Sequence, residues 1–293
     1  MSTPVDLLPG FASHWIDTDA GKIFARSAGA GEPLLLLHGF GETHLAWRKI
    51  APRLARRFRL VLMDLRGYGW SAAPASENGA AYTKRAMAGD VVKVMEELGA
   101  IEFALAGHDR GARVGLRLAL DHPGRVKQLA LIDIAPLEEA LGEGNIARVG
   151  RARFMSFEAP RPENLIAQDA KTFLFDALKS GTKSGKLDPF ADVLDAYAQA
   201  FDEPLRIHAF CEDFRAGEGL DKEALLADKA AGKRLIMPTL VLWSAIHFPE
   251  SPSLLHVWRD WADNLSGEPI DCGHYLAEEA PEAVLMALEG FFS

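Results

Sequence analysis

An aspartate occupies the place of a nucleophile in the stretch ALAGHDRGARVG, residues 104–115. Gly107 precedes Asp109 by two positions and Gly111 follows it by two, with an apolar run just before and a helical pattern just after. This spacing is typical of a strained strand-to-helix turn that tolerates only small neighbours and holds a nucleophile clear of the sheet. Aspartate is also a common helix N-cap, so the local pattern leaves both interpretations open.

Two further segments could complete a catalytic set. The run PLLLLHGFG places Phe40 in a loop whose backbone N–H, together with that of Arg110, could form an oxyanion hole. In DCGHYLAEEAP, His274 follows the last apolar run and could act as a general base. A glycine turn and a capping or core histidine are the structural alternatives. The order nucleophile, acid, histidine along the chain favours catalysis.

The acid of such a set must come from the end of a strand. The loop after PTLVLWS has no carboxylate until Glu250, whereas Asp133 closes the apolar run QLALID. We therefore predict that Asp133 orients the imidazole of His274 and stabilises its charged form. The alternative is that Asp133 caps a turn or a helix before Pro136.

Two arginines follow the aspartate closely. Arg110 and Arg113 fall in the first turn of the expected helix, where a cation opposes the helix dipole by a few tenths to ~1 kcal/mol. An anion bound between them would explain this placement, and the planar fork of arginine suits a carboxylate. The alternative is a pair of solvated arginines.

Short apolar runs alternate with helical patterns along much of the chain, which predicts a parallel sheet with crossover helices. The expected strands lie at residues 22–27, 33–39, 58–64, 103–108, 128–133, 238–244 and 269–273. Helical patterns cover 82–99 and 110–123. The uninterrupted apolar runs indicate strands that are buried on both faces.

The alternation stops after Asp133 and strand patterning resumes at Met237. Between them the chain is typical of several helices joined by loops. Because both flanks are needed to complete one sheet, we predict an α/β fold with its core at 1–135 and 233–293 and a helical cap at 136–232.

Composition narrows the classes of partner. The formal charge is −9 with no basic run, which argues against a nucleic-acid surface, and no segment has the length of a membrane span. The N-terminus lacks a signal-peptide pattern, and the two cysteines indicate free thiols, so we expect a cytoplasmic protein. The oligomeric state is left open, with a homodimer as one option.

Taken together, these segments resemble the α/β-hydrolase superfamily, and more closely its haloacetate (fluoroacetate) dehalogenase branch, over nearly the whole chain. The matching motifs are LLLHGF, DLRGYG, GHDRGARVGLRLALDHP, LIDIAP, HAFCEDFRA and GHYLAEEAP. The resemblance implies that Asp109 is the nucleophile and that Arg110 and Arg113 hold the substrate carboxylate. It also implies a small haloacid and water as reactants, with no cofactor and no metal.

A carboxylate nucleophile suits this chemistry. Asp109 can displace halide from the saturated carbon beside the substrate carboxylate, and His274 can then activate water to attack the resulting ester. Serine would leave a stable ether. The oxyanion hole would serve the second step, when charge develops on the Asp109 oxygen.

The sequence departs from the dehalogenase pattern in the cap. The family's His-Trp pair, which binds fluoride, falls on Arg151 and Ala152 or on Ala152 and Arg153, and its tyrosine is replaced by Phe214. Fluoride is strongly hydrated and needs donors, so we predict that chloroacetate or bromoacetate is hydrolysed far better than fluoroacetate. Arg151 or Arg153 could bind an anion instead, or could lie on a solvated helix face.

Three other functions stay open. An epoxide hydrolase shares the Asp, Asp and His but uses cap tyrosines, of which the segment 136–233 has only Tyr197. An ester or lactone hydrolase would form an anhydride on Asp109. A non-catalytic protein that captures a small carboxylate would keep the pocket without turnover.

Overall fold

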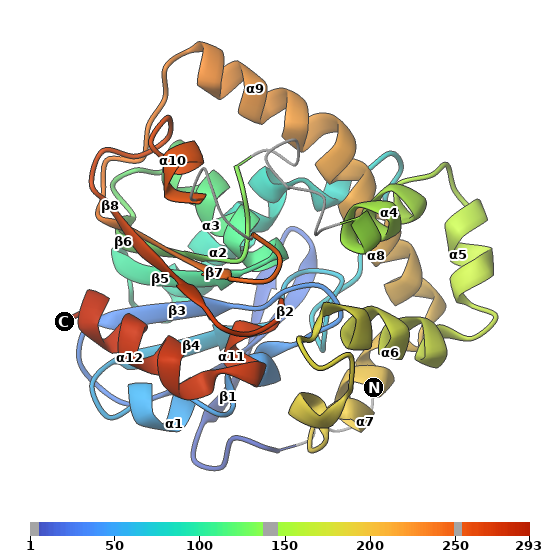
Figure 1. Cartoon of the computed structure of the whole chain (residues 1–293), viewed down its shortest axis with the longest axis horizontal. Helices are drawn as coiled ribbons and strands as arrows, with labels where there is room; N and C mark the ends of the chain where they lie inside the picture. The colour runs from blue at the N-terminus through green and yellow to red at the C-terminus, as the bar shows by residue number, and fades with distance from the viewer. Residues whose placement is uncertain (1–5, 137–145, 249–253) are drawn as a thin grey trace.

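The computed structural model describes residues 6–136, 146–248 and 254–293, and it arranges them as an eight-stranded sheet flanked by helices (Figure 1). The strands are β1 (Ala12–Thr18), β2 (Gly21–Ala28), β3 (Pro33–Leu37), β4 (Arg59–Met63), β5 (Phe103–His108), β6 (Val126–Ile132), β7 (Thr239–Ser244) and β8 (Leu265–Ile270). Their order is β1-β2-β4-β3-β5-β6-β7-β8. β1 and β2 pair antiparallel, as do β2 and β4, and the remaining pairs are parallel. The predicted α/β class is confirmed.

The central strands form where apolar residues run without interruption. All four leucines of β3 are buried, as is every residue of β5, which is the pattern of strands covered by helices on both faces. Parallel register aligns Leu37 of β3 with Gly107 of β5, and His108 of β5 with Ile132 of β6. The loops that follow these three strands therefore meet at one edge of the sheet.

The two edge strands differ from expectation. β1 was not expected as a strand, and β8 begins at Leu265 rather than at residue 269. Both edges are largely exposed and carry polar residues, so their sequences lack the apolar runs that identify the central strands.

Helices cover both faces of the sheet. Those that flank it are α1 (Ala51–Leu54), α2 (Lys84–Glu97), α3 (Arg110–Asp121), α10 (Leu254–Trp258), α11 (Leu276–Glu279) and α12 (Pro281–Phe291). Between β6 and β7 come α4 (Ile146–Met155), α5 (Arg161–Ile166), α6 (Ala170–Gly181), α7 (Leu194–Phe201), α8 (Pro204–Ala216) and α9 (Lys222–Ala230). A π-helical segment, η6 (Gly217–Asp221), joins α8 to α9 into one helical run.

The helices α4 to α7 gather beyond one side of the sheet, as Figure 1 shows in yellow-green, where the predicted cap would lie. Residues 137–145 of that predicted cap, and residues 1–5 and 249–253 of the predicted core, lie outside the described residues. Within the part of the chain that the structure describes, no helix is long and apolar enough to span a bilayer.

Candidate active site

Asp109 lies at a strained corner between β5 and α3. Its φ of 46° is in the left-handed region, which costs a non-glycine residue on the order of 1–3 kcal/mol. The two glycines allow the close packing around it: a Cβ on Gly107 would lie 2.5 Å from the Gly111 carbonyl oxygen, and one on Gly111 would lie 2.6 Å from that of His38. Asp109 precedes α3, but its side chain makes no capping hydrogen bond to the helix. The corner instead directs the carboxylate into a pocket.

The two other members of the predicted set lie beside it. His274 Nδ1 is 2.5 Å from Asp133 Oδ2, and His274 Nε2 is 3.4 Å from Asp109 Oδ2. Asp133 is fully buried at the end of β6, where its Oδ1 accepts a hydrogen bond from the Ser244 backbone at 2.7 Å. This second bond fixes the Asp133 carboxylate, which then fixes the plane of the His274 ring.

The loop after β3 contacts the other oxygen of Asp109. The Phe40 backbone N–H donates to Asp109 Oδ1 at 3.2 Å. The backbone N–H of Arg110 follows directly at the first position of α3. The two oxygens of Asp109 thus have different surroundings, since Oδ1 faces a backbone donor and Oδ2 faces the imidazole.

A pocket of about 500 Å³, including its open mouth, surrounds these groups. Its lining residues are Phe40, Asp109, Arg110, Arg113, Val149, Arg151, Ala152, Phe214, His274 and Tyr275. Asp133 lies behind His274 and outside this lining, and Arg153 is exposed on α4. Val149 and Tyr275 were not predicted, although Tyr275 directly follows His274 in the sequence.

Arg110 is already engaged by a carboxylate that was not predicted. Its Nε and Nη2 donate to Asp213 Oδ2 and Oδ1, each at 2.8 Å, and its guanidinium lies 4.5 Å from the centre of the Phe214 ring. Of the three guanidinium nitrogens of Arg110, Nε and Nη2 bond to Asp213, and Nη1 has no hydrogen-bond partner among the described residues. Arg110 can therefore offer a substrate carboxylate only the Nη1 side of its guanidinium. A two-arginine site for that carboxylate needs Arg113 as its second member.

Asp213 is the centre of a buried polar cluster. Its carboxylate also accepts from Tyr68 Oη at 2.6 Å and from the Lys84 ammonium. Burial alone would raise the pKa of Asp213, but the adjacent Arg110 and Lys84 cations hold it at about 2. The cluster fixes Arg110 in place before any ligand binds. Asp213 belongs to the motif HAFCEDFRA, which gave the only sequence signal for it.

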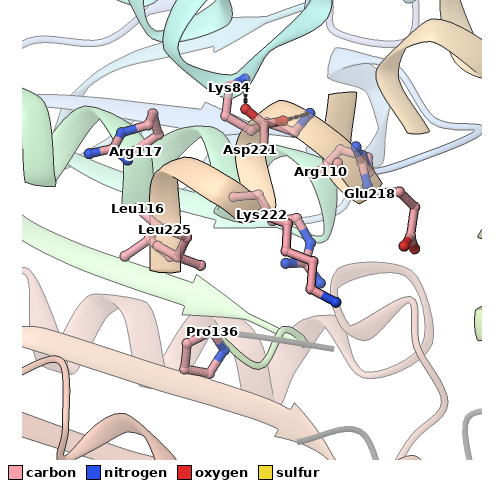
Figure 2. A pocket seen from close by; sticks show the side chains of 11 residues that line it. Lys84, Arg110, Leu116, Arg117, Pro136, Glu218, Asp221, Lys222 and Leu225 are labelled. Carbon is pink, nitrogen blue, oxygen red and sulfur yellow. Dashed lines mark hydrogen bonds and ion pairs between the residues drawn. The ribbon is translucent and has the colours of Figure 1, made fainter. Parts of the chain in front are cut away.

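A second and larger pocket, of about 670 Å³ with its open mouth, is lined by residues of α2, α3, η6 and α9 (Figure 2). It shares Arg110 and Arg113 with the first pocket but contains neither Asp109 nor His274. Cations of this pocket form ion pairs: Lys84 pairs with Asp213 and Asp221, and Arg117 pairs with Asp121 and Asp228. We place the candidate active site in the first pocket, because only that one brings a nucleophile and a base together.

Comparison with known proteins agrees with the fold. The model of a family described as "alpha/beta hydrolase fold" matches residues 32–281. A fluoroacetate dehalogenase from Burkholderia sp. is 35% identical, over 98% of this chain and 95% of that protein. A soluble epoxide hydrolase from Corynebacterium sp. strain C12 is 28% identical, over 98% and 96%. The crystal structure of an alpha/beta hydrolase from Nostoc sp. PCC 7120 superposes with a TM-score of 0.90 at 41% identity, covering 97% of this chain and 98% of that one.

Proposed function

Since the chain belongs to the alpha/beta hydrolase fold family, we propose that it hydrolyses the carbon–halogen bond of short 2-halocarboxylates through an ester on Asp109. The observation that carries the proposal is the pocket that combines an aspartate nucleophile, a histidine base and two arginines. A nucleophile that attacks a neutral acyl group would need no pair of cations beside it. A nucleophile that attacks the carbon next to a substrate carboxylate needs cations to hold that carboxylate.

In the first step the substrate carboxylate binds between Arg113 and the Nη1 edge of Arg110. This places the halogen-bearing carbon near Asp109, whose Oδ2 attacks it. A carbon–oxygen bond forms, the carbon–halogen bond breaks, and halide leaves with its electron pair. Holding both partners in one pocket supplies the orientation that this displacement needs.

In the second step His274 removes a proton from water, and the oxygen adds to Cγ of the Asp109 ester. Charge develops on Oδ1, which already accepts from the Phe40 N–H at 3.2 Å, and the Arg110 N–H is the second donor. Asp133 stabilises the charged imidazole. The intermediate then expels the 2-hydroxy acid, which takes the proton from His274, and one water oxygen stays in Asp109.

The leaving-group side favours chloride or bromide over fluoride. At the positions where the resembling dehalogenases carry fluoride donors, this pocket presents Ala152, Phe214 and Arg151, and the Arg151 Nη1 already donates to Ser180 at 3.0 Å. Chloride and bromide are more weakly hydrated and need fewer donors. We therefore expect chloroacetate to be turned over far faster than fluoroacetate.

Epoxide hydrolysis is the second candidate, because a relative named as a soluble epoxide hydrolase matches nearly the whole chain. Epoxide opening needs a donor for the alkoxide. Tyr197, the tyrosine expected from the cap, donates to Glu278 at 2.9 Å and does not line the pocket, so Tyr275 would have to serve. The arginine pair also has no role toward a neutral epoxide.

One experiment tests the proposal. In a single turnover with chloroacetate in heavy-oxygen water, label should enter the Asp109 side chain, and Asp109→Ala should release no halide. His274→Ala should release one halide per enzyme and then stall as the ester. Asp17→Ala, at an exposed surface ion pair with Lys22, is the matched control and should leave turnover unchanged. If the Asp109 side chain is labelled after turnover of an epoxide but not of a haloacid, the second candidate is correct. If neither substrate leads to label in Asp109, only the binding of a small carboxylate remains.

A further inference from the structure

His108 is a buried histidine directly before Asp109, and both of its ring nitrogens contact acceptors. Nδ1 lies 2.8 Å from Glu42 Oε2, and Nε2 lies 2.8 Å from the backbone oxygen of His274. A carbonyl oxygen only accepts, and an ionised carboxylate only accepts, whereas a neutral imidazole has a single N–H. Both contacts are hydrogen bonds together only if His108 carries two protons.

The surroundings of Glu42 indicate that it is the ionised partner. Its Oε2 also accepts from the Gly39 backbone N–H at 2.9 Å, so this oxygen takes two donors. Burial alone would raise the pKa of Glu42, but the adjacent His108 lowers it below the ordinary value. For His108, burial lowers the pKa, and the Glu42 carboxylate more than reverses this, to about 9. The contacts and the directions of both pKa shifts favour a carboxylate paired with an imidazolium.

The contacts of this pair join three segments of the proposed site. Glu42 holds Gly39, the residue before Phe40, so it fixes the loop that carries an oxyanion donor. His108 holds the backbone of His274, so it fixes the loop that carries the base. The packing is tight, since a Cβ on Gly39 would lie 2.8 Å from His108 Nδ1.

We propose that His108 is a positioning residue that is an imidazolium at neutral pH, bonded to Glu42 and to the His274 backbone, and so aligns the base and the oxyanion loop with Asp109. The role in alignment rests on the proposed function, whereas the charge state does not. The charged and titratable groups that face His108 are Glu42 after β3, Asp109 before α3, Asp133 after β6, and His274 and Tyr275 after β8. Three of them are carboxylates, which favour the cation.

The charge state is tested by NMR of protein with ¹⁵N-labelled histidine. The two ring-nitrogen resonances of His108 are identified as the pair that is missing from the spectrum of His108→Gln. At pH 7.5 both ring nitrogens of His108 should have the protonated resonance and couple to hydrogens, and the second proton should leave only near pH 9. In Glu42→Gln the same transition should move to lower pH. A neutral His108 at pH 7.5 in the wild-type protein overturns the proposal, whatever the enzyme's substrate proves to be.

The role in alignment is tested by separating the two chemical steps. Glu42→Gln at pH 8 should leave ester formation near the wild-type rate and slow ester hydrolysis by about 10- to 100-fold, part of the ~10²–10⁴ that a general base supplies. Hydrolysis by the wild-type enzyme should fall as pH rises through about 9, and this fall should move to lower pH in the variant. His14→Gln, which removes a partly buried histidine bonded to Ser27, is the control and should change neither step. Equal slowing of both steps, with no change in the pH profile, would reduce His108 to a purely structural contact.

Discussion

Replacing Asp213 by asparagine removes one negative charge from a buried cluster while it keeps the size of the side chain. Asp213 is fully buried and its carboxylate accepts from Arg110, Lys84 and Tyr68. A carboxyl held at a pKa of about 2 rather than 3.8 contributes about 2 kcal/mol to folding at neutral pH. Breaking a buried ion pair by removing one partner costs roughly 3–5 kcal/mol. Asp213→Asn should therefore lower the free energy of unfolding by about 2–5 kcal/mol at pH 7.

The pH dependence gives a second and sharper expectation. Because the folded pKa of Asp213 lies below the unfolded value of 3.8, its contribution is fully present above pH 3.8 and is lost as pH falls through about 2. In urea unfolding, the difference between wild type and Asp213→Asn should stay constant from pH 7 to 5 and shrink below pH 4. Asp17→Asn, at an exposed ion pair, should not change stability measurably. A variant as stable as wild type at pH 7, or a difference at pH 2 as large as the difference at pH 7, would refute the account of this cluster.

Three further predictions concern the proposed reaction. Asp133→Asn should lower kcat by about 10³–10⁴ and accumulate the Asp109 ester, since His274 would lose its counter-charge; quenched-flow mass spectrometry of the protein would detect the adduct. Arg113→Gln should raise KM for chloroacetate by about 10-fold or more and leave KM for the uncharged chloroacetamide nearly unchanged, because a charged hydrogen bond is worth roughly 1.5–3 kcal/mol; equal effects on both substrates would contradict the two-arginine site. Phe214→Tyr adds a hydroxyl in the pocket and should raise the ratio of fluoride to chloride release, measured by ion chromatography at matched substrate concentrations, and an unchanged ratio would place the leaving group elsewhere.

The residues of the candidate site that come directly after a strand could be placed from the sequence. Asp109, Phe40 and His274 are marked by an apolar run, a glycine and a following helix, and a parallel sheet brings such positions to one edge. Asp133 was selected because the alternative loop lacked a carboxylate, and it lies 2.5 Å from His274. Local patterns sufficed because each of these residues sits at a fixed place relative to its own strand.

The contacts that depend on packing between distant elements could not be predicted. Asp213 meets Arg110 across 103 residues, and no periodicity encodes that pairing. His108 was part of the motif around Asp109, but its bond to Glu42 depends on how two loops pack. The edge strands β1 and β8 were missed or displaced because half-exposed strands carry little apolar signal.

The Asp213 cluster also bears on how a ligand reaches the pocket. Asp213 is carried by α8, whereas Arg110 and Lys84 are carried by α3 and α2, so the ionic bonds span two separate layers of the molecule. Moving α8 away from α2 and α3 would separate the buried Asp213 carboxylate from two cations. Ligand entry would then depend on other lining residues, such as Val149 and Arg151 of α4, while α8 stays bonded to Arg110.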